Sequence, residues 1–127
     1  MIAKALFSNP EILILDEPCT GLDIYNRSYL FNTIEALARY HQVTMIYVTH
    51  YVEEVLPVFE KTVLMKNGTV FAQGDTAEMF SNETMQRFLN YPVSIEKTHD
   101  GQYQAKLNIE TSIPQWLELG EETWLKN

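Results

Sequence analysis

The chain contains 127 residues, of which 46% are hydrophobic, so it is long enough and apolar enough to form one folded domain. No aliphatic run approaches the ~20 residues that cross a bilayer, and the N-terminus lacks a signal-peptide pattern, which predicts a soluble, cytoplasmic chain. The formal charge of -8 argues against a nucleic-acid partner, because duplex binding usually needs a basic face.

The N-terminal part of the sequence predicts a strand, a long helix and a second strand after the end of an earlier helix. The expected ranges are 1–7 for the helix end, 12–15 for the first strand, 23–40 for the long helix with its cap, and 43–48 for the second strand. Both strands read as short and buried, the first on both faces. Strand, helix and strand at this spacing form a βαβ unit, whose strands nearly always lie parallel.

The long helix has a candidate N-cap in Asp23, because a carboxylate at that position can accept hydrogen bonds from the first free backbone N–H groups. Leu30, Ile34 and Leu37 repeat at helical spacing and form one apolar stripe. We therefore expect this stripe to be buried and the other sides of the helix to face water.

The remaining sequence predicts short helices and two β-hairpins. Asn67-Gly68 is the stronger turn signal, and Asp100-Gly101 is the second. The expected ranges are 51–59 for a short helix interrupted by Pro57, 62–66 and 69–73 for the first hairpin, 75–80 for a helix capped by Asp75 or Thr76, 82–89 for a helix capped by Asn82, 93–109 for the second hairpin, and 114–125 for a short helix and tail.

The first strand ends in two adjacent carboxylates, Asp16 and Glu17. Such a pair would be costly in an apolar interior unless it faces a cation or a reacting group. An aliphatic strand that ends in Asp-Glu is typical of a Walker B site, in which the Asp helps to hold Mg²⁺ and the Glu polarises an attacking water. The sequence contains no G-x-x-x-x-G-K-[ST] loop that would cradle the phosphates.

With the Walker B strand, a Thr-Gly-Leu-Asp loop and a Thr-His pair in this order, the chain resembles the C-terminal part of an ABC-type ATPase domain, from after the signature motif onward. The resemblance covers Met1 to about Phe80, and the Walker A loop, Q-loop and signature motif are absent from the sequence. The matching segments are 1–6 for the helix after the signature motif, 13–18 for Walker B, 20–23 for the D-loop, 48–50 for the switch histidine, and 67–74 for the following hairpin and turn.

This resemblance implies an α/β fold, an incomplete P-loop NTPase (RecA-like) parallel sheet with helices, followed by C-terminal β-hairpins. It divides the chain into residues 1–92, the C-terminal portion of an ATPase domain, and residues 93–127, an extension without an assigned role. It also implies ATP and Mg²⁺ as cofactors. The implied roles are Asp16 in holding Mg²⁺, Glu17 as the general base, His50 at the γ-phosphate, and Asp23 at the nucleotide interface between two ATPase domains.

The family setting predicts part of an ABC transporter ATP-binding subunit, located in the cytoplasm and bound to the membrane through a permease partner. The alternatives are a soluble ABC ATPase of the translation or DNA repair type, and a truncated, non-enzymatic relict. The resemblance predicts an ATPase for the parent protein, whereas the isolated chain is expected to be inactive. Cys19 is expected to be a small buried residue near the site, and His41 and His99 to be solvated.

Overall fold

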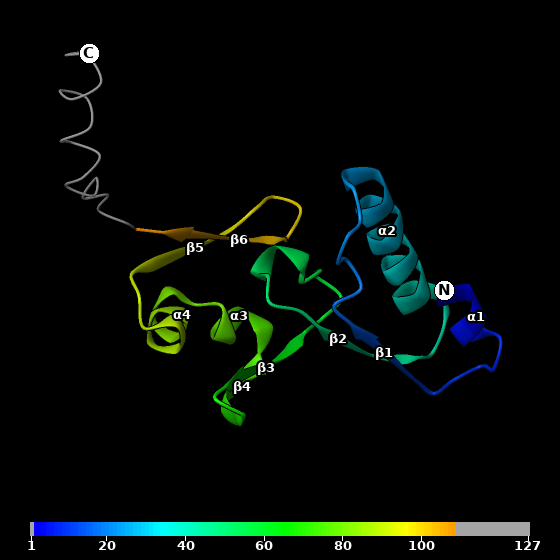
Figure 1. Ribbon diagram of the computed structural model, residues 1–127, viewed down its shortest axis with the longest axis horizontal. Coiled ribbons are helices and arrows are strands. Elements are labelled where there is room, and N and C mark those ends of the chain that lie inside the picture. The colour runs from blue at the N-terminus through cyan, green and yellow to red at the C-terminus, as the bar shows by residue number, and fades with distance from the viewer. Residues whose placement is uncertain (1, 109–127) are drawn as a thin grey trace, which may run out of the picture.

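The computed structural model describes residues 2–108, and the helix and tail expected at 114–125 lie outside the described residues. The order of the elements alternates between helices and strands in the first half and ends in two hairpins (Figure 1). Their bounds are α1 Ile2–Leu6, β1 Ile12–Asp16, α2 Ile24–Tyr40, β2 Thr44–Val48, the 3₁₀ turn η1 Val52–Glu54, β3 Lys61–Lys66, β4 Thr69–Asp75, α3 Thr76–Met79, α4 Asn82–Leu89, β5 Val93–Lys97 and β6 Tyr103–Leu107.

The predicted βαβ unit is confirmed. β1 and β2 pair in parallel, in a register that sets Ile12 opposite Thr44 and Asp16 opposite Val48. α2 lies along one side of this pair, and its apolar stripe is buried against it (Figure 1). The first core cluster consists of Leu13, Leu15, Cys19, Leu30, Ile34, Leu37 and Leu56. The helix therefore packs against the strands, and the carboxyl ends of both strands lie at the same edge of the pair.

The expectation that the first strand is buried on both faces is wrong, and so is the expectation that the second strand is buried, because no residue of β2 is fully buried. Ile12 and Ile14 are 58% and 64% exposed, and Ile46 and Val48 of β2 are 47% and 43% exposed. Side chains alternate between the faces of a strand, so these four residues form one apolar face, and within residues 2–108 no element covers it. The aliphatic run satisfies the pattern of a two-sided strand, but α2 packs on only one of its sides.

A second core lies under the hairpins. The β3–β4 hairpin forms as predicted, with Asn67 and Gly68 at positive φ in its turn. The β5–β6 hairpin also forms, and Gly101 occupies its turn with φ 82°. The residues buried between these hairpins and α3 and α4 are Leu64, Phe80, Met85, Val93 and Tyr103. Val93 is fully buried in this cluster, whereas the proposed domain boundary before it stays a prediction.

Two local expectations need correction, and a third is confirmed in part. The segment 51–59 forms only the three-residue 3₁₀ turn η1, because Pro57 and the extended backbone at Val55 prevent its continuation. α4 is capped by Ser81, whose Oγ accepts a hydrogen bond from Thr84 N at 3.2 Å, and not by Asn82. Asp75 is the N-cap residue of α3, as expected, but its side chain makes no capping hydrogen bond.

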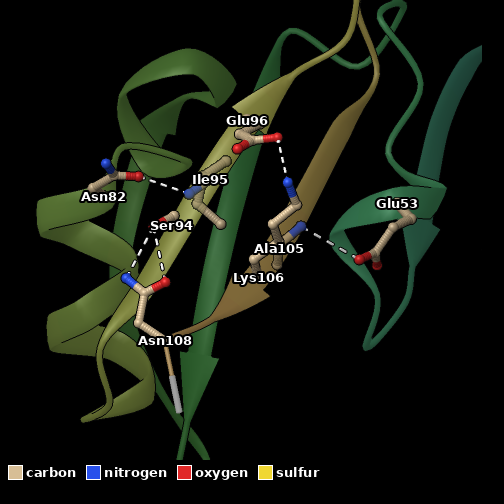
Figure 2. Close-up of polar contacts among 8 residues, drawn as sticks. All are labelled: Glu53, Asn82, Ser94, Ile95, Glu96, Ala105, Lys106 and Asn108. Carbon is tan, nitrogen blue, oxygen red and sulfur yellow. Dashed lines mark hydrogen bonds and ion pairs between the residues drawn. The ribbon is translucent and has the colours of Figure 1, made fainter. Parts of the chain in front are cut away.

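The second hairpin is held by polar contacts on both sides (Figure 2). On one side, Asn82 Oδ1 accepts a hydrogen bond from Ile95 N at 2.7 Å. On the other, Glu53 Oε1 of η1 accepts one from Ala105 N at 3.4 Å. The hairpin thus rests on α4 and on the segment that follows β2. Among the described residues, α2 is the longest helix with 17 residues, and no helix has both the length and the apolar character needed to span a bilayer.

Candidate active site

Glu17 and His50 meet at the carboxyl edge of the parallel pair. Glu17 directly follows β1, and its backbone N–H donates to the carbonyl of Val48 at the end of β2, at 2.8 Å. His50 follows β2 by two residues, and its Nε2 lies 2.5 Å from Glu17 Oε1. The expectation that both side chains arrive at one edge is therefore confirmed. This edge is where open α/β sheets bind their ligands.

The backbone of Glu17 has an unusual conformation. Its φ is 46°, in the left-handed region that residues other than glycine, Asn and Asp seldom adopt. Such a conformation costs on the order of 1–3 kcal/mol, and it persists where the surrounding structure holds it in place. Here the hydrogen bond to Val48 holds it. Strain of this kind is concentrated at catalytic and ligand-binding residues, so the backbone independently marks Glu17 as a candidate.

An open pocket of about 310 Å³ lies next to this pair. It is formed by the loop between β1 and α2, by the start of α2, and by the segment between β2 and η1. The lining residues are Glu17, Cys19, Thr20, Gly21, Leu22, Arg27, Thr49, His50, Tyr51 and Glu54. Both candidate catalytic residues thus face a concave surface, and His50 is well exposed, with 81% of its side chain accessible.

A buried carboxylate, Glu54, also lines the pocket and was missed by the sequence analysis. The whole residue is only 4% exposed. Oε2 accepts hydrogen bonds from Thr49 Oγ1 at 2.5 Å and from Tyr47 Oη at 3.2 Å, and Oε1 lies 3.7 Å from an Arg27 nitrogen. No feature of the sequence distinguishes Glu54 from the exposed Glu53 beside it. Burial alone separates the two.

Tyr47 connects this carboxylate to Cys19. The Cys19 Sγ lies 3.2 Å from Tyr47 Oη, and Cys19 is 4% exposed, which confirms the expectation of a small buried residue near the site. Burial raises the pKa of the Tyr47 phenol above its usual range, and the contacts with Cys19 and Glu54 raise it further. The Tyr47 hydroxyl donates a hydrogen bond to Glu54.

Asp16 and Asp23 lie at the margin of this arrangement. Asp16 ends β1 on the same exposed face as Ile14, and it does not line the pocket. Asp23 is the N-cap of α2, as predicted, with Oδ1 accepting a hydrogen bond from Asn26 N at 2.8 Å. The structure thus brings together Glu17 and His50, whereas the interface role of Asp23 stays a prediction.

Within residues 2–108, no group of three or more His, Cys, Asp or Glu side chains is arranged to hold a metal ion. Asp16 and Glu17 provide two adjacent carboxylates at the end of β1. Mg²⁺ in phosphate-processing sites is typically held by one or two carboxylates together with substrate phosphates and water. The available donors fit that type of site better than a cage built from protein ligands alone.

No protein-family model matches the chain. Among curated proteins, it is similar to the uncharacterized ABC transporter ATP-binding protein YlmA of Bacillus subtilis (strain 168), with 44% identity over 96 residues. This match covers 75% of the chain and 36% of YlmA, so the chain spans little more than a third of that relative's length.

Two solved structures share the fold. One, an inward-facing ABC transporter of metal-chelate type, matches with a TM-score of 0.73 at 22% identity, over 87% of this chain and 45% of that one. The other, CbiO1 of Clostridium perfringens, matches with a TM-score of 0.57 at 32% identity, over 70% of this chain and 36% of that one. These matches confirm the predicted α/β fold of the P-loop NTPase type.

Proposed function

We propose that this chain, an ABC-type ATPase segment by its relatives and its fold, supplies the hydrolytic side chains of an ATP-binding domain. The observation that carries the proposal is the convergence of Glu17 and His50, 2.5 Å apart at the carboxyl edge of the parallel strands. A carboxylate and an imidazole at this edge suit the transfer of a proton from water and the binding of a phosphate oxygen.

Glu17 acts as the general base in this proposal. Its Oε1 and Oε2 can accept a proton from a water molecule that enters the pocket, and 41% of the side chain is accessible to such a molecule. A positioned base typically contributes about 10²–10⁴-fold to the rate. His50 binds the γ-phosphate through Nε2, in place of the contact that this nitrogen makes with Glu17.

Mg²⁺ fits the donor chemistry of the strand end, with Asp16 as its protein ligand. When bound, the ion neutralises the charge that would otherwise make the carboxylates of Asp16 and Glu17 repel a triphosphate. Asp23 is assigned to the interface with a second ATPase domain. Its place in the loop before α2 leaves it outside the pocket and compatible with that role.

The cellular setting follows the names of the relatives. YlmA is named as an ABC transporter ATP-binding protein, and CbiO1 as part of the transporter complex CbiONQ. These names favour a transporter subunit, placed in the cytoplasm against a membrane permease and coupling ATP hydrolysis to transport, over a soluble translation or DNA repair ATPase and over a non-enzymatic relict.

A chimera tests the proposal. The YlmA sequence that precedes the matched segment is joined to this chain, so that the phosphate-binding loop implied by the family is restored; we call this protein the YlmA chimera. We expect it to hydrolyse ATP in the presence of Mg²⁺ at a rate comparable to that of YlmA, measured by phosphate release. A folded chimera that binds Mg·ATP but releases no phosphate would contradict the proposal.

A further inference from the structure

The two glutamates of η1 have opposite surroundings. Glu53 is exposed and contacts the β5–β6 hairpin, as Figure 2 shows. Glu54 is among the residues that line the pocket, and it is 4% exposed. Since they are neighbours of the same residue type in one short turn, they form a natural pair for separating the effect of a local contact from that of a general change in charge.

Glu54 is connected to both sequence neighbours of His50. Its Oε2 accepts a hydrogen bond from Thr49 Oγ1 at 2.5 Å, and the same Thr49 oxygen accepts one from Tyr51 N at 3.1 Å. The backbone on either side of His50 is therefore tied to one carboxylate through one hydroxyl. The polar contact of the His50 ring is with Glu17 and not with Glu54.

The polar groups around Glu54 come from three elements. Arg27 of α2 lies 3.7 Å from Oε1, and Tyr47 of β2 donates to Oε2 at 3.2 Å. The turn after β1 contributes Cys19, which contacts Tyr47 Oη at 3.2 Å. Glu54 thus connects the segment of His50 to the helix and the turn that flank Glu17.

The burial of the Glu54 carboxylate is offset by its hydrogen bonds and its ion pair. Burying a carboxylate costs several kcal/mol unless it is fully hydrogen-bonded, and an apolar side chain of similar size often replaces a buried ion pair without loss of stability. In the described part of the chain, every buried side-chain nitrogen and oxygen has a partner. A fully satisfied polar network fixes the orientation of the groups that it joins.

We propose that Glu54 is a positioning residue for His50. By holding Thr49 and, through it, the backbone of Tyr51, it keeps the His50 ring directed at Glu17 and thus at the phosphate site. The inference rests on the proposed function for the role of His50, but the position of the ring can be measured without ATP.

The primary test uses the full chain and NMR spectroscopy. The readouts are the nuclear Overhauser cross-peaks between the His50 ring and the Glu17 side chain, and the hydrogen exchange rate of the Tyr51 amide. Glu54→Leu removes the acceptor, so we expect the cross-peaks to disappear and the Tyr51 amide to exchange roughly tenfold faster. Glu54→Gln retains an acceptor oxygen for both hydroxyls and should preserve most of the cross-peak intensity.

Two further variants keep the test decisive. Thr49→Val removes the connecting hydroxyl at nearly constant shape, so it should release His50 in the same way. It takes the place of Glu54→Leu in the test if that variant does not fold. Glu53→Gln is the matched control and should leave both readouts unchanged. A folded Glu54→Leu or Thr49→Val variant with wild-type cross-peaks and Tyr51 exchange would overturn the inference.

Hydrolysis by the YlmA chimera separates this inference from the proposed function. Glu54→Leu should lower kcat roughly ten- to a hundredfold with little change in KM, because a small misplacement of a catalytic group is costly, and Glu54→Gln should restore much of the loss. If the wild-type chimera does not hydrolyse ATP although Glu54 controls the His50 cross-peaks, the proposed function fails and the positioning role stands. Unchanged kcat in the Glu54→Leu chimera would contradict the positioning role alone.

Discussion

The β1–α2–β2 unit and the two-hairpin region that follows it use their apolar residues differently. The hairpin region buries Val93 fully and sets Phe80 and Tyr103 edge to face, with their ring centroids 4.9 Å apart. Among its exposed apolar residues are Val63, Met65 and Val70 of the first hairpin. The βαβ unit packs on α2 along one face of its strands and leaves the other face open. It also carries a strained backbone at Glu17 and the buried carboxylate network. The hairpin region is thus distinguished by its packed core, and the βαβ unit by the polar groups at its strand ends.

The largest effect on hydrolysis should come from replacing Glu17, at a strand end of the βαβ unit. Glu17→Gln keeps the size of the side chain and removes the base, so hydrolysis by the YlmA chimera should fall by about 10²–10⁴-fold while ATP still binds. Phosphate release and a nucleotide titration measure the two effects. Glu11→Gln, an exposed substitution just before β1, is the control. Unchanged turnover in Glu17→Gln would refute the assignment of the base.

A smaller loss is expected from His50→Ala. The imidazole is assigned to the γ-phosphate, which ADP lacks, so hydrolysis should fall on the order of a hundredfold while ADP affinity stays nearly constant. His41→Ala, at the exposed end of α2, serves as the comparison. An equal loss of ADP binding would instead assign a folding role to His50.

The two faces of the βαβ unit can be compared by stability. Ile34 is fully buried under the strands, so Ile34→Ala should lower the free energy of unfolding by about 2–5 kcal/mol. Ile46, on the open face, is 47% exposed, and Ile46→Ala should cost about 1 kcal/mol or less. Urea unfolding of the full chain gives both values. Similar losses at the two positions would show that the open face is covered in solution.

The smallest effect concerns the cap of α2. Asp23→Ala removes the acceptor for Asn26 N and should destabilise the chain by about 0.5–2 kcal/mol in thermal or urea unfolding. Asp23→Ser, which can still cap the helix, should recover most of this loss. If both variants were equally destabilised, the side-chain cap would not be the source of the effect.

Much of the site could be predicted from sequence because its residues follow short local rules. A run of aliphatic residues before Asp16-Glu17, an N-cap at Asp23 and a strand that ends near His50 each have a signal within a few positions. The parallel pairing then brings Glu17 and His50 to one edge without any further information. Both hairpins were likewise marked by Asn-Gly and Asp-Gly turns.

The remaining features depend on contacts that are distant in sequence. Nothing in the residue pattern separates Glu54 from Glu53, because burial of Glu54 arises from Arg27 and Tyr47 on other elements. The open face of β1 was missed for the same reason, since an aliphatic run does not reveal how many faces its neighbours cover. Ser81 caps α4, whereas the side chain of Asn82 accepts a hydrogen bond from Ile95 N of the second hairpin.

Calorimetric titration with Mg·ATP tests most directly whether this chain carries the hydrolytic side chains but not the loop that supplies most of the phosphate affinity. The full chain is compared with the Glu17→Gln form of the YlmA chimera, in which hydrolysis does not interfere. Backbone N–H groups and a lysine provide most of the phosphate affinity in P-loop enzymes, and this chain offers carboxylates instead. We expect saturable binding by the chimera and none by the full chain. Micromolar binding of Mg·ATP by the full chain alone would contradict the account.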